Sequence, residues 1–230
     1  MNYEIILLVI ASRGKIYDKL IKNYWIPFIK HSQKYKEINI FLVFGSENKD
    51  GICNEIKDNE LVFENTDDFI PGILIKTIRA FKLINDKYIY NKILRTNLSS
   101  FFIIDKMLKF SYSLPNTSLY AGFIGCYQNK KFCSGAGFWC SKDTIEYILK
   151  NKDNIDYDKP DDVSIGLLFK DSSLKACPRF DIINNVNISN KKKLLQNIIS
   201  KDMYHIRIKN SKDRNLDILY IREFTDYLYK

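Results

Sequence analysis

Ile5-Ile6-Leu7-Leu8-Val9-Ile10 is an unbroken aliphatic run near the start of the chain, and it decides the fold class. Runs of this kind are typical of a strand that is buried on both faces, as in a parallel sheet covered by helices. The run stops at Ala11-Ser12-Arg13-Gly14, after which apolar residues between Ile16 and Trp25 recur at helical spacing. Strand, short polar turn and helix, in this order, predict the opening of a nucleotide-binding α/β fold.

Predicted strands and helices alternate along the rest of the chain. We expect strands at residues 38–44, 61–63, 88–94, 119–127, 132–140 and 203–208. We expect helices from residue 72 onward, at 142–151, at 161–168 and in the C-terminal tail. Neither a linker nor an internal repeat interrupts this pattern. The sequence therefore predicts one domain over residues 1–230, a Rossmann-like α/β domain whose central, mostly parallel mixed sheet is flanked by helices.

The formal net charge of +9 over 230 residues suggests an anionic partner. The positive charges are spread along the chain, and we interpret the longest basic run, Lys191-Lys192-Lys193, as a solvated helical face. No nucleic-acid motif accompanies the charge, so we expect a nucleotide ligand rather than a nucleic acid.

The cysteines and the N-terminus bear on location. The chain has five cysteines, an odd number without a CxxC pair, which favours reduced thiols in a cytosolic protein over a disulfide framework or structural zinc. The apolar run at residues 5–11 is too short for a membrane span and has no basic leader. We therefore expect a cytoplasmic protein with no integral membrane segment.

Polar residues follow the predicted strands at the edge where an open α/β sheet binds ligands. Ser12 and Arg13 come after the first strand, and the cluster from Arg95 to Ser100 comes after a later one. Ser12 and Arg13 could hold a nucleobase or a ribose. The alternative for Ser12 is an ordinary helix N-cap.

Two further segments could carry chemistry. Asp161 and Asp162 head a predicted helix, where the helix dipole alone would stabilise them. Gly135 and Gly137 interrupt the preceding predicted strand, and glycine inside a strand often marks close approach of a ligand.

The third candidate segment is Tyr204 to Lys209. Strand alternation would place His205, Arg207 and Lys209 on one side, as a cradle for a diphosphate or its bound metal. A half-exposed edge strand with solvated cations is the alternative. We expect one pocket to gather these cations and the acid at position 162.

These segments resemble one family of enzymes. Asp161-Asp162-Val163-Ser164-Ile165-Gly166 is similar to the Glu-Asp-Val-x-x-Gly motif of fringe-type and β-1,3-galactosyltransferase-like enzymes. Ser134-Gly135-Ala136-Gly137-Phe138, followed by Ser141-Lys142-Asp143, resembles their Ser-Gly-Gly-Gly-Tyr stretch ending in Ser-Arg-Asp. Lys76-Thr77 takes the place of their Lys-Thr helix, and His205 that of a late metal-binding histidine. The resemblance spans residues 5 to 210.

The resemblance implies a GT-A fold and an inverting hexosyltransferase. The donor would be a nucleotide-diphosphate sugar, with UDP favoured, and the acceptor a glycan or a small molecule with a free hydroxyl. Asp162 would be the general base, Asp161, Gly135 and Gly137 would bind the acceptor, and His205 would bind a metal. We assign donor binding to Ala11, Ser12, Arg13, Lys76, Arg95, Asn97, Ser99, Arg207 and Lys209.

One departure from the family bears on the cofactor. GT-A enzymes usually end their central strand with Asp-x-Asp, whereas this chain has Asn97-Leu98-Ser99 in that place. Amide and hydroxyl oxygens bind hard cations more weakly than carboxylates do. Either Mn²⁺ or Mg²⁺ binds weakly, with Asp67-Asp68 as another anchor, or Arg95, Arg207 and Lys209 neutralise the diphosphate instead.

Three other functions stay open at this point. A non-catalytic GT-A-like domain could bind a nucleotide sugar or a glycan without turnover. A glycoside hydrolase would need two separated carboxylates and no diphosphate cradle. A nucleic-acid-binding protein would exploit the positive charge. The sequence is also compatible with a homodimer.

Overall fold

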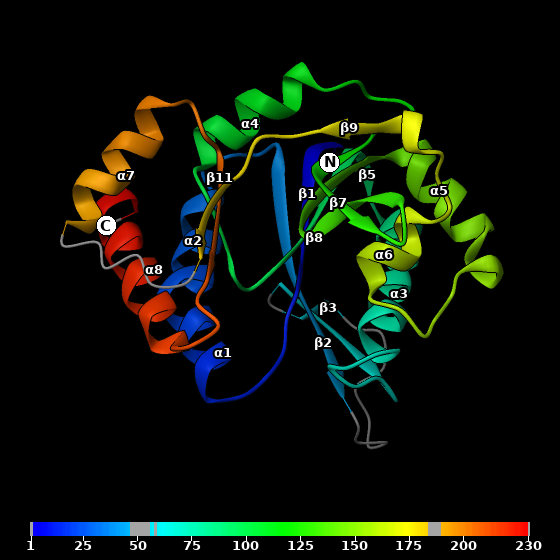
Figure 1. Cartoon of the computed structure of the whole chain (residues 1–230), viewed down its shortest axis with the longest axis horizontal. Helices are drawn as coiled ribbons and strands as arrows, with labels where there is room; N and C mark the ends of the chain where they lie inside the picture. Colours follow the sequence, from blue (N-terminus) through cyan, green and yellow to red (C-terminus); the bar gives the residue numbers. More distant parts are fainter. Residues whose placement is uncertain (1, 47–55, 58, 184–189, 230) are drawn as a thin grey trace. The chain divides into compact units, whose positions relative to one another are not determined.

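The computed structural model divides the chain into two compact units (Figure 1). The residues that it describes are 2–46, 56–57, 59–183 and 190–229. Unit 1 holds the described parts of 1–12, 37–97 and 114–177, and unit 2 those of 13–36, 98–113 and 178–230. One domain over residues 1–230 stays a prediction, because this division does not test it.

Unit 1 is built on a mixed sheet of eight described strands in the order β3-β4-β2-β1-β5-β8-β7-β9. Strands β4, β2, β1 and β5 run parallel, whereas β8 pairs antiparallel with β5 and with β7. The bounds are β1 (Asn2–Ile10), β2 (Ile38–Ser46), β3 (Ile56–Lys57), β4 (Glu60–Glu64), β5 (Ile89–Asn97), β7 (Tyr120–Tyr127), β8 (Lys130–Ser141) and β9 (Leu174–Ala176).

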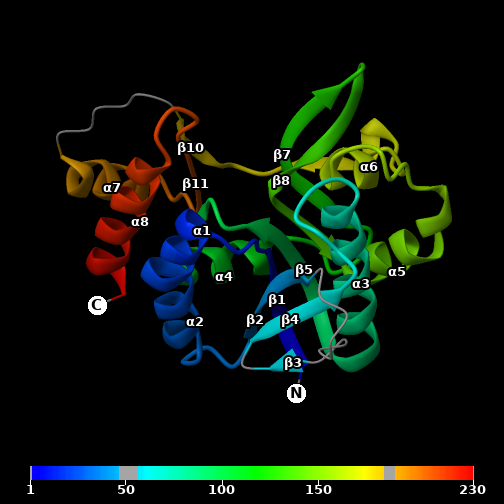
Figure 2. The ribbon, with the colours of Figure 1, turned by 90° about the horizontal axis from the view of Figure 1, so that it is seen from below.

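The aliphatic run of β1 is buried on both faces, as predicted. Ile6 and Leu8 belong to the core cluster that includes apolar residues of α3 (Gly72–Lys87) and α5 (Lys142–Lys150). Ile5, Leu7 and Val9 point to the opposite face and are equally inaccessible to solvent. Figure 2 shows α3 lying along the sheet. The predicted fold class, a mixed central sheet flanked by helices, is confirmed.

The central strand β5 is longer than the sequence predicts. The predicted strand ended before Arg95, but β5 continues through Asn97. Arg95 and Thr96 pair with Phe138 and Gly137 of β8, and the Thr96 hydroxyl donates to the Ala136 carbonyl at 2.5 Å. Polar side chains continue this strand because residues distant in sequence satisfy their hydrogen bonds.

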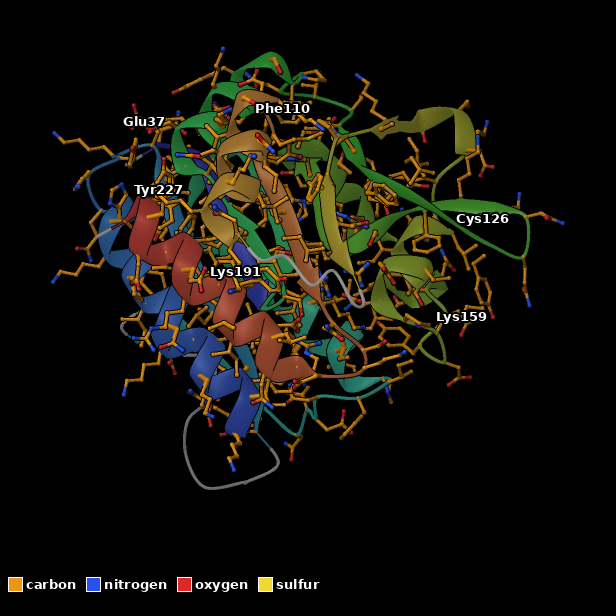
Figure 3. All side chains as sticks on the ribbon, turned by 60° about the vertical axis from the view of Figure 1, so that its left-hand side comes forward. Glu37, Phe110, Cys126, Lys159, Lys191 and Tyr227 are labelled. Carbon is orange, nitrogen blue, oxygen red and sulfur yellow. The ribbon has the colours of Figure 1, made fainter. Side chains whose placement is uncertain are left out.

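Shorter elements complete unit 1. They are η2 (Lys152–Asn154), α6 (Asp161–Gly166) and η3 (Asp171–Ser173). Helix α6 ends two residues before the predicted limit at residue 168. The β7–β8 hairpin extends away from the rest of the unit, with the exposed Cys126 near its tip (Figures 2 and 3). Cys133, Cys140 and Cys177 are also free thiols, while Cys53 lies outside the described residues.

Unit 2 has a second sheet in the order β10-β11-β6, in which β10 and β11 are parallel and β6 is antiparallel to β11. The predicted strand at 203–208 is displaced to His205–Lys209. The bounds are α1 (Lys15–Leu20), η1 (Ile21–Trp25), α2 (Ile26–Ser32), β6 (Ser100–Phe102), α4 (Ile104–Ser113), β10 (Phe180–Ile183), α7 (Lys191–Ser200), β11 (His205–Lys209) and α8 (Arg214–Leu228).

Aromatic side chains hold unit 2 together. Tyr24 stacks on Phe101 of β6 with ring centroids 4.5 Å apart, and its hydroxyl accepts from the Phe102 amide at 2.7 Å. Phe101 also meets Phe224 of α8 edge-on at 5.6 Å. These contacts join the first helical segment, β6 and α8 into one core. Among the described helices of both units, none is long and apolar enough to cross a membrane.

A buried ion pair in unit 1 allows a test of the fold. The Lys92 ammonium lies 2.7 Å from a Glu4 carboxylate oxygen, and both side chains are more than nine-tenths buried. We expect Glu4→Ala to lower the free energy of unfolding by about 3–5 kcal/mol, because it leaves a buried charge unpaired. Urea unfolding followed by circular dichroism measures this loss.

The pair Lys82–Asp86 is the matched control, because both of its side chains are exposed to solvent. The Lys82 ammonium nitrogen lies 2.6 Å from an Asp86 carboxylate oxygen. Asp86→Ala should change the free energy of unfolding by less than about 1 kcal/mol. Equal losses in the two variants would contradict the structural role of the buried pair.

Candidate functional site

The carboxyl ends of β1 and β5 lie side by side in unit 1. Ile10 pairs with Asn97 across the parallel ladder, and the Ala11 amide donates to the Val43 carbonyl at 2.9 Å. The predicted residues Ala11, Ser12 and Asn97 therefore share the edge at which α/β sheets bind ligands. Ala11 is buried and Ser12 is half-buried.

Ser12 does not cap the following helix. The residue at the N-cap of α1 is Gly14, and no side chain caps that helix. Gly14 has a φ of 129°, a left-handed conformation that favours glycine. The alternative interpretation of Ser12 as a helix cap is therefore wrong, and ligand binding by Ser12 and the exposed Arg13 stays a prediction.

Lys76 is completely buried in α3. Its ammonium donates to the Ala11 carbonyl at 2.8 Å and to an Asp68 carboxylate oxygen at 2.5 Å. Burial lowers the pKa of Lys76, and the Asp68 carboxylate partly offsets this by favouring the charged form. Lys76 thus holds the end of β1 against α3, and donor binding by its ammonium stays a prediction.

Arg95 and Asp161 form the second buried ion pair at this edge. Arg95, only 3% exposed, donates to Asp161 and to the Gly135 carbonyl. Asp161, 6% exposed, also accepts from the Thr77 hydroxyl at 3.1 Å. The pair ties β5, β8, α3 and α6 together, because each of these elements supplies one partner. Charge balance by Arg95 explains why Asp161 is tolerated in the interior.

Asp162 is the half-exposed neighbour of this pair. One carboxylate oxygen accepts from the Gly135 amide at 2.6 Å, and the other accepts from the Val163 amide at 2.9 Å. Burial raises the pKa of Asp162 and the Asp161 charge raises it further, while the Gly135 amide and Arg95 only partly oppose the shift. Asp162 therefore holds a proton more readily than an ordinary aspartate.

The structure explains why residue 135, one of the two glycines within β8, is a glycine. A Cβ at Gly135 would lie 2.8 Å from an Arg95 nitrogen and 3.1 Å from an Asp162 oxygen. Glycine is needed here because two side chains of the protein approach the strand closely, so a ligand is not required to explain it. Gly137 pairs with Thr96 in the ladder between β5 and β8. Acceptor binding by Gly135, Gly137 and Asp161 stays a prediction.

The remaining predicted residues lie in unit 2. His205, Arg207 and Lys209 alternate along β11 and become progressively more exposed, as a single strand face requires. The Ser99 carbonyl accepts from the Ile208 amide at 2.7 Å, which places Ser99 beside this strand. Burial lowers the pKa of Lys209, and the nearby Arg207 and Arg214 charges add to this effect.

His205 is a buried core residue with 2% of its surface exposed. Its ring stacks on Phe102 at 4.6 Å, and Nε2 lies 3.1 Å from the Ser100 hydroxyl. Burial lowers the pKa of His205 well below its ordinary value, and Arg179 and Arg207 lower it further. Metal binding by His205 stays a prediction that these contacts do not support.

The described residues do not provide the set of ligands that Mn²⁺ or Mg²⁺ needs. Within them, no group of three histidine, cysteine, aspartate or glutamate side chains is arranged to hold a metal ion. Asp68 is paired with Lys76, and Asp67 accepts from the Phe69 amide at 2.9 Å. Both carboxylates are therefore engaged by groups of the protein itself.

Sequence reasoning missed Arg179 and Arg214, which belong to the same cationic cluster. Arg214 donates to the Ser99 hydroxyl at 3.1 Å, and its Nε lies 2.7 Å from Asp217. Arg179 is paired with Asp181 at 2.6 Å. A signal for Arg214 was available, because a cation in the first turn of a helix opposes the helix dipole and needs another reason to be there.

Each unit thus gathers part of the predicted site. Unit 1 brings together Ala11, Ser12, Lys76, Arg95, Asn97, Gly135, Gly137, Asp161 and Asp162. Unit 2 holds Arg13, Ser99, His205, Arg207 and Lys209. The expected single pocket for Asp162 and the cations stays a prediction, because these residues belong to different units. By itself, unit 1 presents a proton acceptor and unit 2 presents cations suited to an anion.

Comparison with solved structures gave matches that include two glycosyltransferases. A glycosyltransferase involved in the glycosylation of the major capsid of PBCV-1 matches with a TM-score of 0.56 and 8% identity, covering 95% of this chain and 98% of that one. GlyE of Streptococcus pneumoniae TIGR4 matches with a TM-score of 0.47 and 11% identity, and the match covers 99% of this chain but only 65% of GlyE. HddC from Yersinia pseudotuberculosis matches with a TM-score of 0.41 and 14% identity, and the match covers 76% of this chain and 89% of HddC.

The likeness to the PBCV-1 enzyme shows a shared fold. Comparisons with protein-family models and with curated proteins gave no match.

The Arg95–Asp161 pair allows a test of how the site is held. We expect Arg95→Met to lower the free energy of unfolding by about 3–5 kcal/mol, because Asp161 would stay buried without a counter-charge. Chemical denaturation of the purified variant gives the value. The double variant Arg95→Met/Asp161→Asn should regain much of the loss, since it also removes the stranded charge. A double variant as unstable as the sum of both single variants would argue against the pair.

Proposed function

We propose that the protein is a glycosyltransferase that moves a hexose from a nucleotide-diphosphate sugar to an acceptor hydroxyl with inversion. The α/β fold shared with the PBCV-1 enzyme is compatible with this chemistry. The observation that carries the proposal is Asp162, a half-exposed carboxylate with a raised pKa at the ligand-binding edge of the sheet. General bases are commonly tuned in this direction.

Asp162 is suited to remove the proton of the acceptor hydroxyl. Each of its oxygens accepts one backbone hydrogen bond, which leaves a second lone pair on each for the incoming hydroxyl. As the acceptor oxygen attacks the anomeric carbon, its proton passes to Asp162 and the bond to the nucleoside diphosphate breaks. The two amide contacts orient the carboxylate, so little reorganisation is needed during the reaction.

The proposed binding site for the sugar donor includes positively charged side chains. Arg207 and Lys209 would stabilise the negative charge that grows on the leaving diphosphate. Arg214 contacts Ser99, another predicted donor-binding residue, so we add it to this group. UDP is the favoured nucleotide because the fringe-type and β-1,3-galactosyltransferase-like enzymes that the motifs resemble mostly use it. Free thiols at the four described cysteines favour a cytoplasmic site of action.

A second candidate function is a non-catalytic GT-A-like domain that binds a nucleotide sugar or a glycan. The observation that favours it is Asn97 at the end of β5, where related enzymes place the first carboxylate of Asp-x-Asp. This candidate predicts donor binding without turnover.

Donor binding can be measured by thermal shift with UDP-, GDP- and dTDP-sugars, each with and without Mn²⁺. One donor should raise the melting temperature, because a ligand that binds only the folded state stabilises it. Lys209→Gln should weaken binding of that donor by about 10- to 100-fold, the loss expected for a charge-assisted hydrogen bond. Lys201→Gln removes an exposed lysine of the same unit and should leave binding unchanged. If no nucleotide sugar shifts the melting temperature, the transferase fails, and of the second candidate only glycan binding is left.

Catalysis is tested with Asp162→Asn. We expect transfer to the acceptor to fall by about 10²–10⁴-fold while the donor-induced thermal shift persists, because only the proton acceptor is lost. Asp158→Asn, which removes an exposed carboxylate four residues earlier, is the control and should retain full activity.

The pH dependence of the parent enzyme provides a second readout of Asp162. A general base works only when deprotonated, so activity should be lost as the pH falls through the raised pKa of Asp162. The acid limb of kcat/KM should therefore lie above the range of an ordinary aspartate, whose pKa is about 3.9. Near-normal turnover by Asp162→Asn would remove this residue from the mechanism.

A further inference from the structure

The first helical segment of unit 2 exposes a row of lysines. Helices α1, η1 and α2 follow one another without a break from Lys15 to Ser32. Exposed residues recur along the segment and its C-terminal extension at intervals of three or four, which places them on one face. We call this face the lysine face; it consists of Lys15, Lys19, Lys22, Ile26, Lys30 and Lys34. The segment is the blue ribbon in Figure 3, where Glu37 marks the chain beyond its end.

The positive charge of this face is not neutralised locally. Between positions 15 and 36 the chain has six lysines and one acidic residue, Asp18. None of the five lysines of the face forms an ion pair with an acid in the described part of the chain. Uncompensated lysines on one helical face attract anionic surfaces.

Acidic side chains on neighbouring elements are engaged elsewhere. Helix α8 packs against α1 and η1, and its Glu223 lies 3.0 Å from Lys191 of α7. Its Asp217 is buried 2.7 Å from Arg214. Asp105 of α4 is the exception, because its partner is the neutral Tyr35 hydroxyl at 2.5 Å, so this carboxylate stands near the C-terminal end of the face. The five lysines outnumber Asp105 and Asp18, so the face keeps a net positive charge.

The centre of the face is apolar. Ile26 is 55% exposed, a large fraction for an isoleucine. A pocket of about 440 Å³ opens beside it, and its lining combines apolar and basic side chains. The pocket is lined by Lys22, Ile26, Pro27, Lys30, His31, Lys34 and Tyr229. An apolar centre with ammonium groups on either side of it along the helix matches an amphiphilic, negatively charged partner.

We propose that the lysine face binds the surface of an anionic membrane. Its lysines would lie among the phosphate headgroups, and Ile26 would enter the boundary between headgroups and acyl chains. The helical residues 15–32 extend over about 27 Å, so the row can contact a flat surface along its length. A nucleic acid would pair its phosphates with the lysines, but its outer surface is a charged backbone, which offers the exposed Ile26 less apolar area than the boundary of the acyl chains does. The membrane is therefore the better match.

Vesicle cosedimentation tests this proposal with the full-length protein. We expect binding to vesicles of phosphatidylcholine with 30% phosphatidylserine, and little binding to phosphatidylcholine alone. Each lysine near an anionic surface contributes about fivefold to affinity. The variant Lys22→Gln/Lys30→Gln/Lys34→Gln should therefore bind about a hundredfold more weakly, and added salt should weaken binding of the parent protein.

Two variants control for fold and for net charge. Lys22→Arg/Lys30→Arg/Lys34→Arg keeps the charges and should bind like the parent protein. Lys130→Gln/Lys131→Gln/Lys175→Gln removes three exposed lysines from unit 1 and should also retain binding. Ile26→Ser should weaken binding several-fold without changing the charge.

Three results would overturn the proposal. The first is equal binding to neutral and anionic vesicles, and the second is equal loss in the two glutamine variants, which would indicate a general charge effect. The third is competition by a duplex oligonucleotide that displaces the protein fully from vesicles and binds Ile26→Ser as tightly as it binds the parent protein. This result would indicate that the lysine face binds a nucleic acid. The proposal is independent of glycosyl transfer, because the donor-induced thermal shift without vesicles should be the same in all these variants.

Discussion

The ion pair between Arg95 and Asp161 is the interaction on which the architecture of the acidic site depends. Two opposite charges are buried together, and each is tolerated only because the other is present. The pair brings together β5, which carries Arg95, and α6, which carries Asp161. The Gly135 carbonyl of β8 and the Thr77 hydroxyl of α3 complete the shell. Asp162 owes its position to this arrangement, because it follows Asp161 on the same short helix.

The adjacent carboxylates of Asp161 and Asp162 therefore differ in their surroundings. Asp161 is neutralised, buried and structural, whereas Asp162 is half-exposed and has a raised pKa. Lys76 plays a comparable structural part at the end of β1, where its buried ammonium binds Ala11 and Asp68. Buried charges therefore hold this edge of the sheet together, and Asp162 is the carboxylate of the adjacent pair that stays partly open to solvent.

Unit 2 uses positive charge in two different ways. At β11, burial lowers the pKa of Lys209, and the charges of Arg207 and of Arg214 on α8 lower it further. Along the lysine face the charges are spread over a helical surface with an apolar centre, which suits a broad anionic partner. The net charge of +9 alone does not distinguish these two uses, because it contains no information about position.

The sequence by itself determined the α/β class, the doubly buried first strand, the alternation along β11 and the position of Asp161 and Asp162 at a helix start. These features depend on residues close together in the chain, whose periodicity reflects local backbone geometry. Only the tertiary structure decided that β5 continues through Arg95, that Lys76 is buried and that Gly135 makes room for two side chains. The partners responsible are far apart in sequence: Arg95 lies 66 residues from Asp161, and Lys76 lies 65 residues from Ala11. A buried polar side chain is stable only with its partner, and local periodicity cannot identify a partner that the fold brings from so far away.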